Sequence, residues 1–250
     1  MSIADKLQII AENEQKVFDA GAKSEYDKFW DNVQQNGNKT DYRYAFAGTS
    51  WNSENFKPKY KIIPKDYSWG KANGNMFECF DIAQKYPPLE LTEELIDFSN
   101  ASELIKTFAN ANISKVEMNV VPQNLTYMGD TFLQNNMSTA TIATIKIGVN
   151  EQTTYSTNCF RAGFISNVSF ITGSIVGNSI TFFYCKKLTK ESITNIINVL
   201  STNTTAKTLT LSVVAVNTAF ETSTGAADGS TSTEWTTLIA TKSNWTISLV

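Results

Sequence analysis

The residues of this chain that are best suited to chemistry are four carboxylates that lie close together. They fall within the segment PPLELTEELIDF and are Glu90, Glu93, Glu94 and Asp97. Two carboxylates that face one cleft, one of them with a raised pKa, can hydrolyse a glycosidic bond. Carboxylates on a short polar segment are more often solvated charges. We expect solvated charges here and predict no catalytic residue.

The chain contains no histidine. This excludes Ser-His-Asp and Cys-His catalysis, imidazole acid–base chemistry, and zinc or iron sites with imidazole ligands. The sequence also lacks the glycine-rich patterns of nucleotide-binding loops, the nucleophile elbow of hydrolases and the calcium-binding loop. We therefore expect a protein that is not an enzyme and needs no cofactor.

Three cysteines, Cys79, Cys159 and Cys185, are far apart in the sequence and form no C-x-x-C pair. Neither a disulfide framework nor a zinc site is indicated, and a reducing compartment suits such cysteines. No basic neighbour that would lower the pKa of Cys79 is evident, so we expect it to be a small buried hydrophobic residue. We predict no metal site.

Composition excludes further classes of protein. The net charge is −3, which disfavours a nucleic-acid partner because phosphate backbones attract basic surfaces. The first residues lack the pattern of a signal peptide, and no apolar stretch approaches a membrane span. We expect cytoplasmic synthesis without a signal peptide and no membrane insertion. With 250 residues, of which 42% are hydrophobic, the chain can bury a sizeable core.

Residues 2–35 carry apolar side chains at helical spacing, and the turn-prone NGNKTD at 36–41 follows. The pattern predicts an N-terminal helical segment over residues 1–40. Its apolar stripe has to pack against something. Two interpretations stay open: the helix covers the end of the following core, or residues 1–36 mediate homo-oligomerisation or docking.

From about residue 41 an irregular repeat begins. A large aromatic residue starts each unit, and another apolar residue follows five positions later, or six in the last unit. The pairs are Phe46 and Trp51, Phe77 and Ile82, Phe108 and Ile113, Phe132 and Met137, Phe160 and Ile165, and Phe182 and Leu188. The six phenylalanines are separated by 31, 31, 24, 28 and 22 residues, which is within or just above the range of leucine-rich repeats, roughly 20–29 residues.

Alternating apolar residues follow several of these pairs and predict short strands. The runs are Val116, Met118 and Val120; Ile145 and Ile147; and Val168 and Phe170. A single short strand cannot bury its apolar face alone, so stacking of successive units in parallel is the economical arrangement. The alternative from composition is an ordinary β sandwich whose strands happen to begin with phenylalanine.

One segment decides between these alternatives. VVPQNLTYMGDTFLQNNM, residues 120–137, resembles the repeat of the BspA-type leucine-rich-repeat family, I-x-I-P-x-x-V-x-x-I-G-x-x-A-F-x-x-C-x-x-L. Matching positions are occupied by Pro122, Leu125, Met128, Gly129, Phe132 and Met137, while Thr131 replaces the usual Ala and Asn135 the usual Cys. Ile62-Ile63-Pro64 matches the proline portion, and the segment from Phe182 through Cys185 to Leu188 matches the F-x-x-C-x-x-L portion. The resemblance implies an α/β fold: an irregular leucine-rich-repeat-like solenoid of short parallel strands over residues 41–188.

Other segments resemble leucine-rich-repeat-like proteins of phages and prophages of gut Firmicutes. These segments are YAFAGTSWN, FKPKYKIIP, LTKESITNIINVLS and SNWTISLV. The likeness implies a virion-associated or tail-associated role, either in adhesion or in assembly.

Residues 189–250 are expected to form a C-terminal helix and strand cap. Thr189 is a plausible N-cap for a helix with an apolar stripe at Ile193, Ile196, Ile197 and Leu200, and Leu209 and Leu211 then alternate as in a strand. The small polar residues 221–233 predict a surface loop. A short helix containing Trp235, Leu238 and Ile239 and a terminal strand containing Trp245, Ile247 and Leu249 are expected to follow.

The expected function is non-enzymatic binding or adhesion, in which the solenoid surface meets a protein or a glycan through many shallow contacts. The alternative is a structural or assembly protein of a virion or scaffold that oligomerises through residues 1–36. Tyr60, Tyr67 and Trp69 could stack on sugars, although core or rim packing is the more common role of such residues. The pattern identifies no ligand-binding residue.

Overall fold

A computed structural model describes residues 68–69, 88–99, 101–111, 113–134, 142–203, 206–221 and 232–250. In these segments the protein is α/β, with short parallel strands and a few helices near the C-terminal end. The predicted fold class is confirmed at this level. The predicted N-terminal helical segment and the first two repeat pairs, Phe46 with Trp51 and Phe77 with Ile82, lie outside the described residues.

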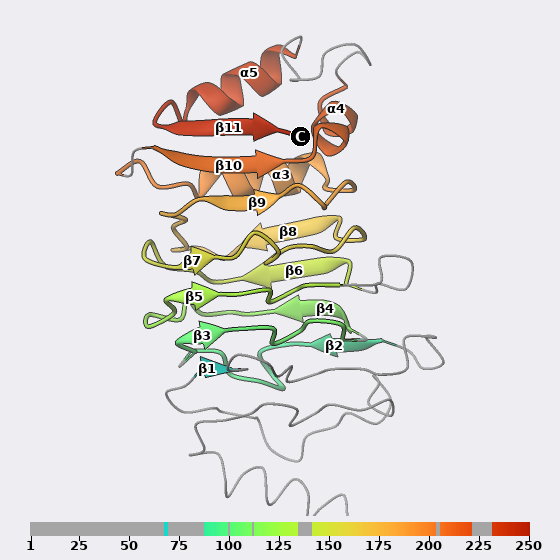
Figure 1. The fold of residues 1–250 in the computed structure, drawn as a ribbon, viewed down its shortest axis with the longest axis vertical. Helices are drawn as coiled ribbons and strands as arrows, with labels where there is room; N and C mark the ends of the chain where they lie inside the picture. The colour runs from blue at the N-terminus through green and yellow to red at the C-terminus, as the bar shows by residue number, and fades with distance from the viewer. Residues whose placement is uncertain are drawn as a thin grey trace, which may run out of the picture.

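The strands form three sheets in which every pair is parallel. One sheet has the order β1-β3-β5-β7 and consists of Ser68–Trp69, Glu103–Leu104, Tyr127–Met128 and Thr154–Tyr155. A second has the order β2-β4-β6-β8 and consists of Leu89–Leu91, Ile113–Glu117, Thr144–Ile147 and Asn167–Phe170. The chain therefore alternates between two columns of strands as it advances (Figure 1).

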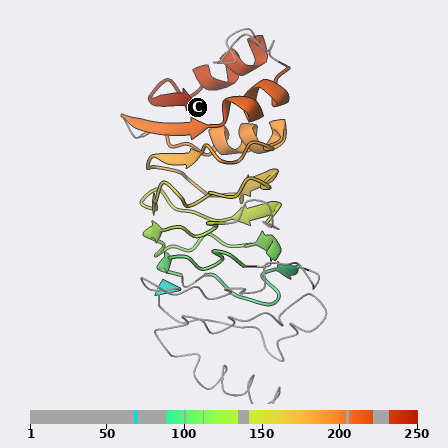
Figure 2. The same ribbon diagram turned by 45° about the vertical axis from the view of Figure 1, so that its right-hand side comes forward.

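At the C-terminal end a third sheet and three helices follow the two columns of strands. β9 (Ile180–Phe182), β10 (Lys207–Leu211) and β11 (Trp245–Leu249) form the third sheet. The helices are α3 (Lys190–Asn198), α4 (Val213–Ala219) and α5 (Thr233–Ala240). Figure 2 shows the three helices gathered above β8, opposite the three strands. Helices thus replace strands in one of the two columns.

A row of neighbouring phenylalanine rings lies in the core of the described structure. We call Phe108, Phe132, Phe160 and Phe182 the phenylalanine ladder, because successive ring centroids lie 5.4, 5.5 and 4.4 Å apart. All four side chains are at most 1% exposed. These four of the six repeat phenylalanines are therefore successive neighbours in the core; Phe46 and Phe77 lie outside the described residues.

The residues that follow the ladder also behave as predicted. Ile113, Ile165 and Leu188 are buried, and so are Val116, Met118, Ile145, Ile147, Val168 and Phe170. Val120 is a correction, since it is 39% exposed. β4 ends at Glu117, so the alternation does not extend to Val120, which precedes the turn at Pro122. An antiparallel sandwich is wrong for the described residues, because all their strand pairs are parallel.

The C-terminal elements agree with the sequence in most respects. Thr189 is the N-cap of α3, with its hydroxyl oxygen accepting a hydrogen bond from the Ser192 amide at 3.3 Å. The predicted apolar stripe of α3 is buried, and the predicted strands are β10 and β11. The predicted loop is too long by one residue, because α5 begins at Thr233 with Ser232 as its N-cap; residues 222–231 lie outside the described segments.

Side chains of α3 complete the hydrogen bonding of β8. The Ser192 hydroxyl oxygen accepts from the Val168 amide at 2.9 Å, and the Asn195 side-chain oxygen accepts from the Phe170 amide at 2.6 Å. A strand edge without such partners would leave backbone donors unsatisfied. The helix therefore ends the β2-β4-β6-β8 sheet without exposing the edge of β8.

Replacing Ser192 with alanine should lower the free energy of unfolding by roughly 1–2 kcal/mol, because the buried Val168 amide loses its acceptor. Urea denaturation followed by circular dichroism would measure the loss. Asn198→Ala, which removes an exposed side chain of the same helix, is the control and should change stability by less than about 0.5 kcal/mol. Equal stability of the two variants would show that α3 does not satisfy β8 in this way.

Candidate binding surface

The four carboxylates singled out from the sequence have different surroundings in the structure. Glu90 is exposed on β2 and Glu94 is exposed in the turn that follows, whereas Glu93 is only 8% exposed. The Asp97 carboxylate accepts a hydrogen bond from the Ser99 amide at 2.9 Å. A hydrogen bond to Glu117 raises the pKa of Lys115 on the neighbouring strand, and the charge of Glu90 adds to the shift. The expected solvated charges are found at Glu90 and Glu94, whereas the expectation is wrong for Glu93, which is buried.

The described cysteines are buried in the core beside the phenylalanine ladder. Cys159 and Cys185 are free and 0% exposed. Burial raises the pKa of the Cys185 thiol to about 12 and that of the Cys159 thiol well above its usual range. The Cys185 thiol donates to the Phe160 carbonyl oxygen at 3.1 Å. Thiols held protonated in this way are poor nucleophiles. Cys79 lies outside the described residues.

The described residues form neither a candidate metal site nor a candidate membrane-spanning helix. Across the described ranges, no three His, Cys, Asp or Glu side chains come together in a way that could hold a metal ion. None of the helices formed by these residues is long and apolar enough to cross a membrane. The aromatic residues suggested for sugar stacking are not placed: Tyr60 and Tyr67 lie outside the described segments, and only the backbone of Trp69, in β1, is described.

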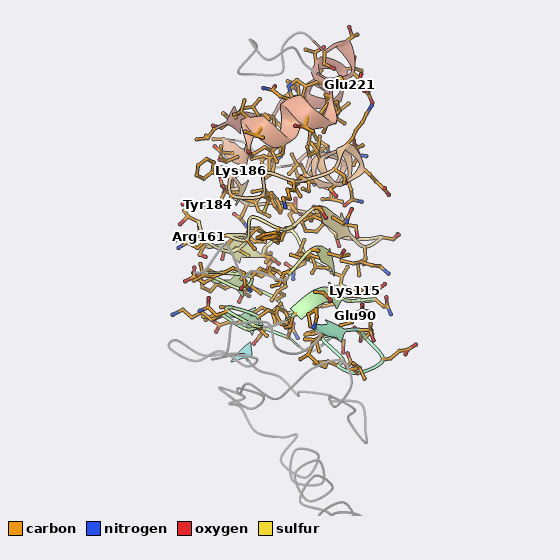
Figure 3. The ribbon with its side chains drawn as sticks, turned by 90° about the vertical axis from the view of Figure 1, so that its right-hand side faces the viewer. Glu90, Lys115, Arg161, Tyr184, Lys186 and Glu221 are labelled. Carbon is orange, nitrogen blue, oxygen red and sulfur yellow. The ribbon has the colours of Figure 1, made fainter. Side chains whose placement is uncertain are left out.

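The outward side of the β2-β4-β6-β8 sheet is an ordered polar surface, which we call the sheet face. The strand registers place its residues in two rows that cross the strands. One row is Glu90, Lys115, Thr144 and Asn167, and the other is Glu117, Lys146 and Ser169. The residues between them on each strand, such as Val116 and Ile145, are buried. Figure 3 shows Glu90 and Lys115 side by side on this face.

Two ion pairs lie on the sheet face, one within β4 and one between β4 and β6. The Glu117 carboxylate lies 2.7 Å from the Lys115 ammonium and 2.8 Å from that of Lys146. Hydrogen bonds from Lys115 and then from Lys146 hold the pKa of Glu117 below its usual range. The Lys146 ammonium also donates to the side-chain oxygen of Asn119 at 3.3 Å. Opposite charges therefore largely balance here, and the surface favours polar contacts over attraction of one charge sign.

Glu117→Gln should reduce stability near neutral pH by less than about 1 kcal/mol, because the pairs are partly exposed. The pKa of Glu117 is lowered in the folded state, so its stabilisation is present above the unfolded pKa of about 4.3 and disappears as the pH falls through the folded value. Urea denaturation at pH 7 and pH 3 should show a difference between wild type and variant that is smaller at the lower pH. A difference independent of pH would mean that the charge of Glu117 is not responsible.

The apolar alternation of these strands predicts their buried residues, but the sheet face was not predicted. The signal was present in the same alternation, because residues between buried positions must point outward. Their alignment into rows depends on strand register, which a single strand does not specify.

Comparisons with known protein families, with curated proteins and with solved structures find no match to this chain.

Proposed function

We propose that this chain is a non-enzymatic binding protein, built as an irregular leucine-rich-repeat-like solenoid, and that the sheet face contacts its ligand. Three features support the solenoid: the phenylalanine ladder, the alternation of the chain between two columns of parallel strands, and the use of helices in place of strands above β8. Each layer packs mainly on its neighbours, as in repeat proteins.

The observation that carries the binding proposal is the in-register arrangement of the sheet face. Neighbouring strands of a sheet lie about 4.8 Å apart, so each row offers hydrogen-bonding groups at regular intervals along the stack. Lys115, Lys146 and Asn167 come from β4, β6 and β8, which are neighbours in the sheet. A protein or glycan that lies along the stack could contact all three. Many shallow polar contacts of this kind suit recognition better than chemistry.

The experiment is a glycan and protein array probed with the purified chain and with a variant carrying Lys115→Ala, Lys146→Ala and Asn167→Ala. The wild type should bind a limited set of ligands, and the variant should lose at least about tenfold in affinity for them. A control variant with Asn198→Ala and Thr237→Ala, both exposed on helices, should bind as the wild type does. An array without any binding, or equal binding by all three proteins, would overturn the proposal.

We also propose that the protein associates with a virion. The support is the likeness of several sequence segments to phage and prophage proteins. The neighbouring genes test this extension separately. Tail or lysis genes beside this one would support it, and metabolic genes would contradict it.

A further inference from the structure

A second surface gathers positive charge and aromatic rings. We call Arg161, Phe164, Phe183, Tyr184, Lys186 and Lys187 the basic–aromatic patch. These residues follow Phe160 and Phe182, two neighbouring members of the phenylalanine ladder. Figure 3 shows Arg161, Tyr184 and Lys186 along one edge of the molecule, away from Glu90 and Lys115. The patch shares no residue with the sheet face.

Aromatic rings hold two of the cations of the patch in place. The guanidinium carbon of Arg161 lies 5.0 Å from the centre of the Tyr184 ring, and the Lys187 ammonium lies 4.2 Å from that of Phe164. Phe183 packs against Tyr184 at 4.7 Å between ring centres. Such cation–π contacts restrict long side chains before a ligand arrives, which lowers the entropy that binding has to overcome.

The positive charges of the patch lack counter-charges. In the part of the chain that the structure describes, the salt bridges use Lys115, Lys146 and Lys190, and none involves Arg161, Lys186 or Lys187. The Arg161 Nε atom is buried and has no hydrogen-bond partner there. On the sheet face, by contrast, each lysine is paired with Glu117. A cluster of unpaired cations on a protein of net charge −3 is complementary to an anionic ligand.

The aromatic rings narrow the chemistry of that ligand. Phe164 is 37% exposed, and an exposed ring can lie against the apolar face of a sugar. A guanidinium group binds carboxylate or sulfate oxygens with two parallel hydrogen bonds. Three cations are few for a nucleic acid, whose binding depends on many phosphate contacts. We propose that the basic–aromatic patch is a binding site for an acidic glycan, with its anionic groups on Arg161, Lys186 and Lys187 and a sugar ring on Phe164.

The test measures binding of the full chain to four immobilised polymers at low ionic strength. Polygalacturonate carries carboxylates and heparin carries sulfates together with carboxylates, so these two arms distinguish the anionic group. Neutral dextran and single-stranded DNA are the comparison polymers. Binding should occur to at least one acidic glycan, should be weaker for DNA, and should be absent for dextran.

Variants assign the binding to the patch. Lys186→Gln with Lys187→Gln should weaken binding roughly tenfold, since each exposed ion pair contributes modestly. Lys190→Gln with Lys207→Gln changes the net charge equally outside both surfaces, at lysines that contact Glu234 and Asn178, and should stay within about twofold of the wild type. Phe164→Ala should weaken binding while leaving its dependence on salt concentration unchanged, because it removes a ring and no charge.

Three outcomes would overturn this assignment: no binding to either acidic glycan, tighter binding to DNA than to glycan, or equal losses in the two double-lysine variants. The sheet-face variant should keep its binding to acidic glycans even if the array shows no ligand for the sheet face. In that case the proposal for the patch holds and the proposal for the sheet face fails. The reverse result would leave the sheet face as the binding surface, so the two proposals can fail separately.

Discussion

Replacing Phe132 with alanine should lower the free energy of unfolding by about 3–5 kcal/mol, the usual loss for a buried phenylalanine. Its ring is 0% exposed and lies between those of Phe108 and Phe160, at 5.4 and 5.5 Å between centres. A cavity at this position interrupts the ladder in its middle, and the neighbouring rings cannot move toward each other without displacing their own strands. Urea denaturation followed by circular dichroism measures the loss.

Two variants make the result specific. Phe132→Leu keeps most of the apolar volume and should lose clearly less stability than Phe132→Ala. Val214→Ala removes a side chain that is 51% exposed on α4 and should change stability by less than about 0.5 kcal/mol. A loss of under about 1 kcal/mol for Phe132→Ala would mean that the ladder is not the core of the fold.

The ladder is also the feature that the sequence predicts best. One large ring per unit recurs along the chain, and a stack of short strands needs one such group per layer to fill its axis. The burial of Ile145 and Val168 follows from alternation within a strand. Both signals are local: each depends on residue type and on spacing within a few dozen positions.

Contacts between surface side chains could not be predicted in the same way. Arg161 meets Tyr184, and Lys187 meets Phe164, across 23 residues of sequence. The loop lengths that bring these pairs together vary from unit to unit, so spacing alone does not indicate which side chains meet. The carboxylates around Glu90 are close in sequence, yet they have different surroundings in space. Closeness in sequence therefore does not predict a shared site. The prediction for Val120 was wrong because β4 ends before this residue, ahead of the turn at Pro122.

Asparagine side chains provide another contact between layers that the sequence did not reveal. The Asn150 amide nitrogen donates to the carbonyl oxygens of Pro122, Gln123 and Leu125 at 3.1, 3.2 and 2.9 Å. Asn178 makes the equivalent contacts with Glu151, Gln152 and Thr153 one layer further on. Each amide thus satisfies a turn of the preceding layer, where the backbone has no strand partner.

Asn150→Asp should therefore lower the free energy of unfolding at pH 7 by about 2–3 kcal/mol. The carboxylate keeps the acceptor that receives the Gln152 amide at 3.0 Å, but it cannot donate to the three carbonyl oxygens and repels them. Asn167→Asp, at an exposed position of β8, adds the same charge and should change stability by less than about 0.5 kcal/mol.

The dependence on pH separates loss of the donor from general disruption. The carbonyl oxygens favour the protonated form of the introduced carboxyl group, so its folded pKa should lie above the unfolded value of about 3.9. Stability is then retained below the unfolded pKa and lost as the pH rises through the folded one. Relative to Asn167→Asp, the deficit of Asn150→Asp should be small near pH 3.5 and widen toward pH 7. A deficit of the same size at both values would show that the substitution acts through packing, because only an ionised carboxylate lacks the proton that the turn requires.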